Sequence, residues 1–203
     1  MLLLLALPAL AGDELPQVYG MRGVDLACAA CLDARELGLT ASASSTLSPE
    51  SRYGAALAVD GELATAWCEG AEGAGSGTTL HLHLARPAQV YAVAVFGGYF
   101  KSAATLRNNH RLRTATWTIG ERTWAVDLAD PAQPLAVDPS TNLAIDPAGW
   151  FDQARAGEPP WVIVDSAPVQ DLVLTLDQVW PGQKAEDTCL SEIAVQLVDP
   201  DTE

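Results

Sequence analysis

Hydrophobic and polar residues alternate in short runs along most of the chain. Eight such runs carry β-branched or aliphatic residues at every second position, which predicts strands with one buried face. They are residues 37–44, 78–84, 89–96, 112–119, 122–128, 161–166, 171–179 and 191–198. Clusters of Gly, Pro and Asp separate the runs. Ile-Gly-Glu-Arg at 119–122 predicts a compact hairpin.

Helical periodicity is confined to two short stretches. Residues 31–39 (CLDARELGL) and 49–61 (PESRYGAALAVDG) each predict one or two helical turns. A chain of strands without long intervening helices favours a sandwich or a barrel. The number of predicted strands favours an all-β, antiparallel jelly-roll β-sandwich.

Two regions do not follow the strand pattern. Residues 129–160 carry Pro at intervals and no strand periodicity, which predicts a long irregular insertion. Residues 1–11 form an apolar run ending in small residues, which predicts a signal peptide too short to span a membrane. The alternative is a buried N-terminal segment. We therefore predict an extension over 12–36, a sandwich over 37–203, and a secreted, periplasmic or cell-surface location.

Composition and charge narrow the partners. The chain has 203 residues, of which 49% are hydrophobic, enough for one globular domain. Its formal net charge is -15 at pH 7. Such a charge repels phosphate, which excludes nucleic acid as a partner and disfavours anionic membrane surfaces.

The four cysteines suit an oxidising compartment. Cys28 and Cys31 form a C-x-x-C motif, while Cys68 and Cys189 stand far apart. A zinc ribbon would need a second close pair, and a thioredoxin-like site would need a βαβ unit. Structural disulfides are the favoured interpretation, with three pairings open.

Four segments occur in an order typical of one family. They are SASSTL, then YGAALAVDGELATAWCEGAEGAGSG, then GGYFKSAATLRNNHRLR, and finally VWPGQKAEDTCLSEIAV. Over about residues 40–198 the chain resembles discoidin-like domains, also called coagulation factor 5/8 type C domains. Its Gly-Tyr-x-Lys-Ser, Asn-Asn-x-Arg and Asp-Thr-x-x-Ser-Glu-Ile pieces resemble the bacterial NADase-type glycan-binding domain.

The resemblance implies a galactose-binding-like β-sandwich that attaches a protein to carbohydrate. Such modules accompany NAD-cleaving enzymes in some proteins, where the hydrolytic domain is a separate piece. We therefore expect no enzyme activity, and a non-catalytic glycan-binding module is the leading hypothesis. The alternative is a protein–protein adhesion domain of the same fold, with an exposed apolar patch around Trp150, Phe151 and Trp161.

The resemblance also implies a structural calcium ion. Its side-chain ligands would be Asp60, Thr65 and Glu192, joined by backbone carbonyls of the 57–65 turn. The alternative is that Asp60 caps its own turn and Glu192 meets a basic side chain. If Asp60 and Glu192 converge as in the family, the resemblance further implies a Cys68–Cys189 disulfide. Cys28–Cys31 would then be the second bridge.

Ligand contacts are expected on two loops. The glycine-rich stretch 68–77 would place Glu69 against sugar hydroxyls. The stretch 97–120 has no acidic residue and offers an aromatic face and hydrogen-bond donors. Its candidate ligand residues are Tyr99, Lys101, Asn108, Asn109 and Arg111. The alternative for Arg111 or Lys101 is neutralisation of Glu69, Glu186 or Asp187 in a buried network.

His81 and His83 stand two apart on a predicted strand, so they share one face while the neighbouring leucines share the other. A zinc pair completed by His110 is one interpretation. A solvent-facing strand surface is the favoured one. Four tryptophans are expected as core or loop anchors: Trp67, Trp117, Trp124 and Trp180.

Overall fold

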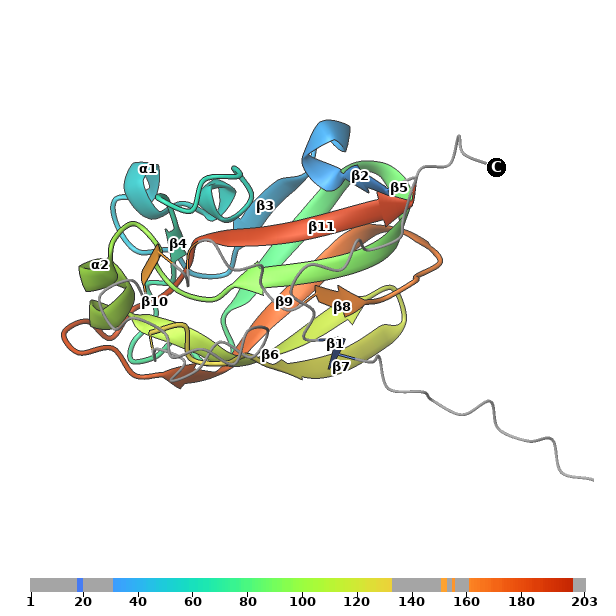
Figure 1. The fold of residues 1–203 in the computed structure, drawn as a ribbon. Helices are drawn as coiled ribbons and strands as arrows, with labels where there is room; N and C mark the ends of the chain where they lie inside the picture. Colours follow the sequence, from blue (N-terminus) through green and yellow to red (C-terminus); the bar gives the residue numbers. More distant parts are fainter. Residues whose placement is uncertain (1–17, 20–30, 133–150, 153–154, 156–160, 199–203) are drawn as a thin grey trace, which may run out of the picture.

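The structure is a computed structural model that describes residues 18–19, 31–132, 151–152, 155 and 161–198 (Figure 1). It contains two β-sheets that share one long strand, β5 (Thr79–Phe96). In sheet A the order is β2 (Cys31–Asp33), β11 (Glu192–Val198), β5, β8 (Trp161–Ile163) and β1 (Val18–Tyr19). In sheet B it is β3 (Thr40–Ala43), β5, β9 (Pro168–Trp180) and β6 (His110–Ile119).

Three further strands complete sheet B beyond β6. β7 (Arg122–Asp127) forms the predicted hairpin with β6. β10 (Thr188–Leu190) pairs with the start of β6 in parallel, and with β4 (Trp67–Cys68) in antiparallel fashion. The predicted all-β, antiparallel jelly-roll sandwich is confirmed, with the β10–β6 pair as a parallel exception.

Strand β5 joins two runs, 78–84 and 89–96, that the sequence pattern predicts as separate strands. Its first half alternates between core and solvent and pairs with β3 and β9, while its second half is buried or half-buried throughout and pairs with β11 and β8. The pairing with β9 shifts between His83 and Ala88, across the exposed segment around Pro87. Pro lacks the N–H of a regular ladder, so the pattern breaks there although the chain remains extended.

The core lies between the two sheets. Leu80, Leu82 and Leu84 are buried while His81 and His83 on the opposite face are exposed, so the predicted solvent-facing strand surface is confirmed. His83 Nδ1 lies 2.7 Å from Asp171 Oδ1 across the sheet. The predicted core tryptophans Trp67, Trp117 and Trp124 are buried, and Trp180 anchors the loop after β7 by donating to the Leu128 carbonyl (3.1 Å).

Short helices cover the sheet ends. The two predicted helical stretches form η1 (Ala34–Leu37), α1 (Glu50–Tyr53) and η2 (Ala55–Ala58). The sequence analysis missed α2 (Ala103–Asn108), whose N-terminus is a reciprocal capping box between Ser102 and Thr105. In Figure 1, α1, α2, β4 and β10 lie together at one end of the sandwich.

The predicted domain limits differ from the structure at one point. Cys31–Asp33, placed in the extension, pairs with β11 and forms the edge of sheet A. The predicted signal peptide (1–11), Cys28, Trp150 and most of the 129–160 insertion lie outside the described residues. In the described part of the chain, no helix has the length and apolar character needed to cross a membrane.

Candidate functional site

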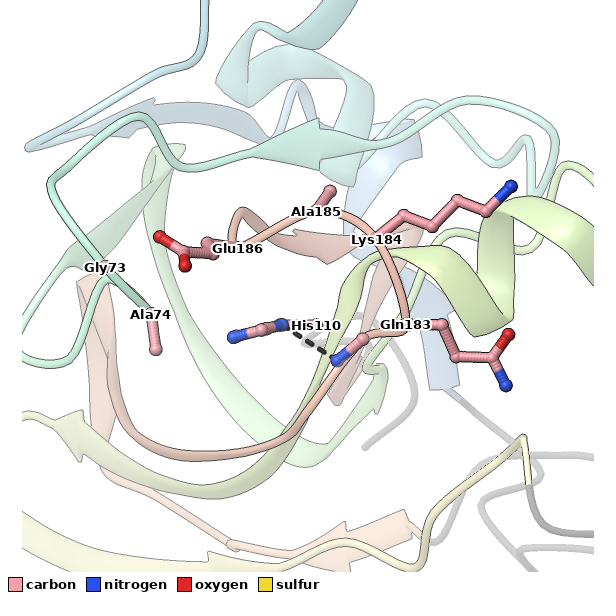
Figure 2. A pocket seen from close by; sticks show the side chains of 8 residues that line it. Gly73, Ala74, His110, Gln183, Lys184, Ala185 and Glu186 are labelled. Atoms are coloured by element: carbon pink, nitrogen blue, oxygen red, sulfur yellow. Dashed lines mark hydrogen bonds between the residues drawn. The ribbon is translucent and has the colours of Figure 1, made fainter.

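A cavity of about 410 Å³ opens at the end of the sandwich that carries α2 and β10. Two loops and the first residue of β6 form it (Figure 2). We call residues 69–77 the glycine loop and residues 181–187 the pocket loop. The lining residues are Gly73, Ala74, His110, Gly182, Gln183, Lys184, Ala185 and Glu186. The cavity is therefore mostly polar backbone with a few polar side chains.

The pocket loop is held by the C-terminal end of α2. The last carbonyls of a helix have no partner within it. Here the amides of Gln183, Lys184 and Ala185 donate to them, at 2.9 Å to Arg107, and at 3.1 and 2.9 Å to Asn108. Gly182 passes so close to the helix end that a Cβ would lie 2.4 Å from the Asn108 carbonyl oxygen. A short helix thereby fixes the pocket loop.

His110 presents one ring nitrogen to the cavity. Its Nδ1 accepts a hydrogen bond from the Gly182 amide (2.9 Å). Burial lowers the pKa of His110, against a raising effect of Glu186. In the neutral ring, a nitrogen that accepts leaves the proton on the other one, so Nε2 is a donor. Figure 2 shows this nitrogen pointing into the space between Ala74 and Glu186.

Glu69 holds the opposite wall. It is fully buried, and its carboxylate accepts from the amides of Ala71 (2.7 Å) and Thr188 (3.1 Å). Burial raises the pKa of the Glu69 carboxyl against the opposing effect of these bonds. Gly75 packs on the carboxylate, since a Cβ there would lie 2.3 Å from Glu69 Cδ. Glu69 thus shapes the glycine loop from behind; the ligand contact expected of it stays a prediction.

A disulfide joins the strands next to both loops. Cys68 in β4 and Cys189 in β10 are bonded, with their Cα atoms 4.1 Å apart and a sequence separation of 121. This confirms the predicted pair. Cys31 is disulfide-bonded as well, and its predicted partner Cys28 lies outside the described residues.

Arg111 also lies behind the cavity. Its guanidinium is 5% exposed and forms an ion pair with Asp130, with Nε 2.7 Å from Oδ1. Further donor bonds reach the carbonyls of Leu106 (3.2 Å), Asn109 (3.1 Å) and Pro181 (3.1 Å). The expected buried ion-pair network therefore exists, but its acid is Asp130 and none of the three acids expected. Arg111 fastens α2, β6 and the pocket loop together.

The other predicted ligand residues fall in two groups. Asn108 and Asn109 end α2, and Asn109 Nδ2 donates to the Thr105 carbonyl (2.8 Å). Tyr99 is 8% exposed and packs against Ala66 and the disulfide, and Lys101 is exposed just before α2. The structure thus brings Glu69, Asn108, Asn109 and Arg111 around the cavity as its support. None of the six predicted residues is part of its lining.

Asp60, Thr65 and Glu192 meet at the turn formed by residues 60–65, which we call the Asp60 turn. Asp60 accepts from the Glu62 amide (2.9 Å) and the Thr65 hydroxyl (2.7 Å). Glu192 is 6% exposed and accepts from the Gly61 amide (2.8 Å). Burial raises the pKa of Glu192 to about 7. Asp60 thus caps its own turn, as the alternative interpretation expects.

These residues do not fit a calcium ion in this arrangement. Calcium takes about six to eight oxygen ligands around one point. Both Asp60 oxygens and the Thr65 hydroxyl are engaged with each other or the turn backbone. The guanidinium of Arg35 also lies against Gly61 in the middle of the turn.

Residues 35–196 match the family described as the NAD glycohydrolase translocation F5/8 type C domain. The chain belongs to this family. The match confirms the predicted resemblance. No curated protein sequence matches this F5/8 type C domain.

Solved structures with the same fold come from Clostridium perfringens. A family 32 carbohydrate-binding module (CBM) of NanJ, in complex with galactose, is 17% identical, has a TM-score of 0.50 and covers 82% of this chain and 98% of its own. CBM32-3 of a family 31 glycoside hydrolase is 14% identical, has a TM-score of 0.52 and covers 81% and 93%. At these identities the likeness establishes the fold of the F5/8 type C domain.

A further match is to part of a larger enzyme. The family 89 glycoside hydrolase of C. perfringens, in complex with GlcNAc-α-1,4-galactose, is 14% identical, with a TM-score of 0.48. The match covers 83% of this chain and 15% of the enzyme. The F5/8 type C domain therefore spans a small share of that enzyme's length.

Sequence reasoning missed His110 and Glu186 as site residues. His110 was considered only as a third zinc ligand, although it lies between two of the predicted ligand residues, Asn109 and Arg111. Glu186 was considered only as an ion-pair partner. The available signal was the Trp-Pro-Gly sequence at 180–182, which predicts a turn after a strand and so places the following polar residues on an exposed loop.

Proposed function

We propose that this F5/8 type C domain binds a glycan, and that the cavity between the glycine loop and the pocket loop receives a sugar hydroxyl pair. The observation that carries the proposal is the pairing of a fixed donor and an acceptor across an open polar cavity. His110 Nε2 is the donor, and the Glu186 carboxylate, exposed on the other side of the cavity, is the acceptor.

Neighbouring hydroxyls of a sugar ring both donate and accept hydrogen bonds, so a donor next to an acceptor is complementary to them. Hydrogen bonds to a charged group contribute about 1.5–3 kcal/mol each, more than bonds between neutral groups. Both pocket walls are tied to rigid elements, the pocket loop to α2 and the glycine loop to β10. A preformed site loses little free energy to ordering when a ligand binds.

The charges around the cavity favour an uncharged or amino sugar over an acidic one. Lys184 and Glu186 both line the cavity, but Figure 2 shows the Lys184 side chain pointing away from His110 while Glu186 lies across from it; Asp187 and Glu69 lie next to the cavity, and the whole chain carries a net charge of -15. Arg111, the nearest buried cation, is neutralised by Asp130. A negative local potential would repel a carboxylated sugar, whereas a neutral hexose has no net charge to be repelled.

The domain acts by binding, without turnover, outside the cytoplasm. The family membership and the shared fold with family 32 modules support a role in carbohydrate attachment. The disulfide between Cys68 and Cys189 supports an oxidising compartment. The protein–protein adhesion alternative gains no observation here, because Trp150 lies outside the described residues and Phe151 packs against the Phe100–Leu106 cluster.

A glycan array with the oxidised protein tests the proposal. We expect binding to neutral or amino-sugar glycans and weaker binding to sialylated ones. Glu186→Gln, which is on the surface, should weaken binding about tenfold. The matched control is Glu72→Gln, an exposed acid of the glycine loop that does not line the cavity. Folded protein that binds no glycan, or that binds equally well as Glu186→Gln, would contradict the proposal.

A further inference from the structure

Three carboxylates surround one guanidinium at the Asp60 turn. Asp33 holds Arg35 directly, and Asp60 and Glu192 lie close enough to interact with it electrostatically. The three acids and one base leave an excess of negative charge. Glu192 is almost completely buried, so water does not screen its charge well. The Arg35 side chain, which is 43% exposed, supplies a positive charge on the solvent side of this cluster.

Arg35 is oriented by its own helical turn. Asp33 is the N-cap of η1 and accepts from the Arg35 amide (2.9 Å). The same carboxylate accepts from Arg35 Nε, at 3.0 Å to Oδ1 and 2.9 Å to Oδ2, and pairs with Nη2. A planar guanidinium held on one edge by a carboxylate keeps its other edge free to face a second group.

That other edge faces Gly61. A Cβ on Gly61 would lie 1.8 Å from Arg35 Nη1, so the guanidinium rests directly on the backbone of the turn. The Gly61 amide donates to Glu192 Oε2, which places the Glu192 carboxylate on the same short peptide segment. Gly61 also has a φ of 82°, which favours glycine. Attraction by Asp33 first, and then by Glu192 and Asp60, raises the pKa of Arg35.

We infer that the Arg35 guanidinium is the resident cation of the Asp60 turn, and that it makes this turn independent of a metal ion. The family resemblance implies calcium next to Asp60 and Glu192. In this chain a side chain from the N-terminal edge of the sandwich supplies the positive charge there. This inference does not depend on the glycan proposal.

Two observations favour a guanidinium over a metal here. The side-chain oxygens of Asp60 and the hydroxyl of Thr65 already form hydrogen bonds with each other and with the turn backbone. A fixed positive charge against Gly61 would also repel a divalent ion from the same carboxylates. Arg35 further links η1 to the Asp60 turn, and η1 follows β2, so it ties two distant segments together.

Thermal unfolding in CaCl₂ and in EDTA tests the inference on the full chain. We expect the wild-type protein to have the same Tm in both buffers. Arg35→Gln should lower the Tm by about 4 °C in EDTA. Arg35→Lys keeps a positive charge, so its Tm should fall by less than that of Arg35→Gln. The matched control is Arg86→Gln, an exposed arginine on β5, which should leave the Tm unchanged.

A second variant separates charge neutralisation from general packing. If Arg35 neutralises Glu192, then Glu192→Gln in the Arg35→Gln background should recover at least half of the lost Tm. If Arg35 acts only through packing, the decreases in Tm caused by Arg35→Gln and by Glu192→Gln should add in the double variant. A wild-type Tm that rises in CaCl₂ would overturn the inference, and so would an Arg35→Gln protein as stable as Arg86→Gln. Glycan binding is not a readout of this test, so its outcome is separate from that of the proposed function.

Discussion

The glycine loop and the Asp60 turn are each held by a buried glutamate, but the groups that contact the two glutamates differ. Glu69 accepts from two backbone amides, with no basic side chain bonded to it in the part of the chain that the structure describes, and the disulfide next to it closes the region covalently. Glu192 accepts from one amide, and the attraction of Arg35 partly offsets its burial. The first loop is closed by a covalent bond and hydrogen bonds, the second by hydrogen bonds next to a guanidinium. The two should therefore respond to different perturbations.

The largest loss in the free energy of unfolding should follow removal of the disulfide. Cys68→Ala/Cys189→Ala opens a loop of 121 residues, and the chain-entropy estimate is a loss of about 4–5 kcal/mol in the free energy of unfolding. Chemical denaturation measures it. As a control, Cys28→Ala/Cys31→Ala removes a bridge predicted to close a very short loop and should cost much less. Equal losses would show that the glycine loop does not depend on its covalent closure.

The pH dependence of stability should belong mainly to the Asp60 turn. The folded pKa of Glu192 is raised to about 7 from a usual value of 4.5. Its stabilising contribution is complete below pH 4.5 and is lost as pH rises through 7, because the folded state binds the proton more tightly. Relative to Glu192→Gln, the wild type should lose up to about 3 kcal/mol across this range. A constant difference between the two proteins would contradict the assignment.

A smaller loss should follow Glu69→Gln. The amide side chain keeps one acceptor oxygen, so either the Ala71 amide or the buried Thr188 amide loses its partner. This should cost about 2 kcal/mol. Chemical denaturation at neutral pH measures it, with Glu72→Gln as the exposed control in the same loop. An unchanged stability would show that the glycine loop is held by the disulfide without Glu69.

The smallest effect is expected for Thr65→Val. The hydroxyl donates within the Asp60 turn, which is partly exposed, so its loss should cost about 1 kcal/mol. If the variant is as stable as the wild type, Glu192 and Arg35 close the turn without help from the Asp60 side chain. If it loses several kcal/mol, the turn is less dependent on charge than we infer.

The sequence predicts the sandwich well because alternation reports burial directly. β6, β7 and β11 lie within one or two residues of the predicted strands. The union of 78–84 and 89–96 into β5 was missed, because Pro87 and its exposed neighbours interrupt the pattern without ending the strand. The two-residue strand β4 is too short to carry any periodicity.

Several of the predicted ligand residues lie behind the lining of the cavity. Residue type identifies polar groups in loops, but not whether a side chain faces the ligand or the backbone behind it. Glu69 and Arg111 have the chemistry of ligand contacts, yet neighbouring amides, carbonyls and Asp130 occupy them. Asp130 comes from the stretch after β7, and no local pattern links it to Arg111. The lining itself is mostly backbone, which sequence patterns do not reveal.

Strand β5 has a consequence for how the domain unfolds. One continuous strand supplies a neighbour to β3 and β9 in sheet B and to β11 and β8 in sheet A. Neither sheet can separate without breaking a ladder of the other. Its central amides should therefore exchange with solvent hydrogen only through global unfolding, with the same free energy of opening in both halves. The two sheets should therefore unfold together, because β5 belongs to both.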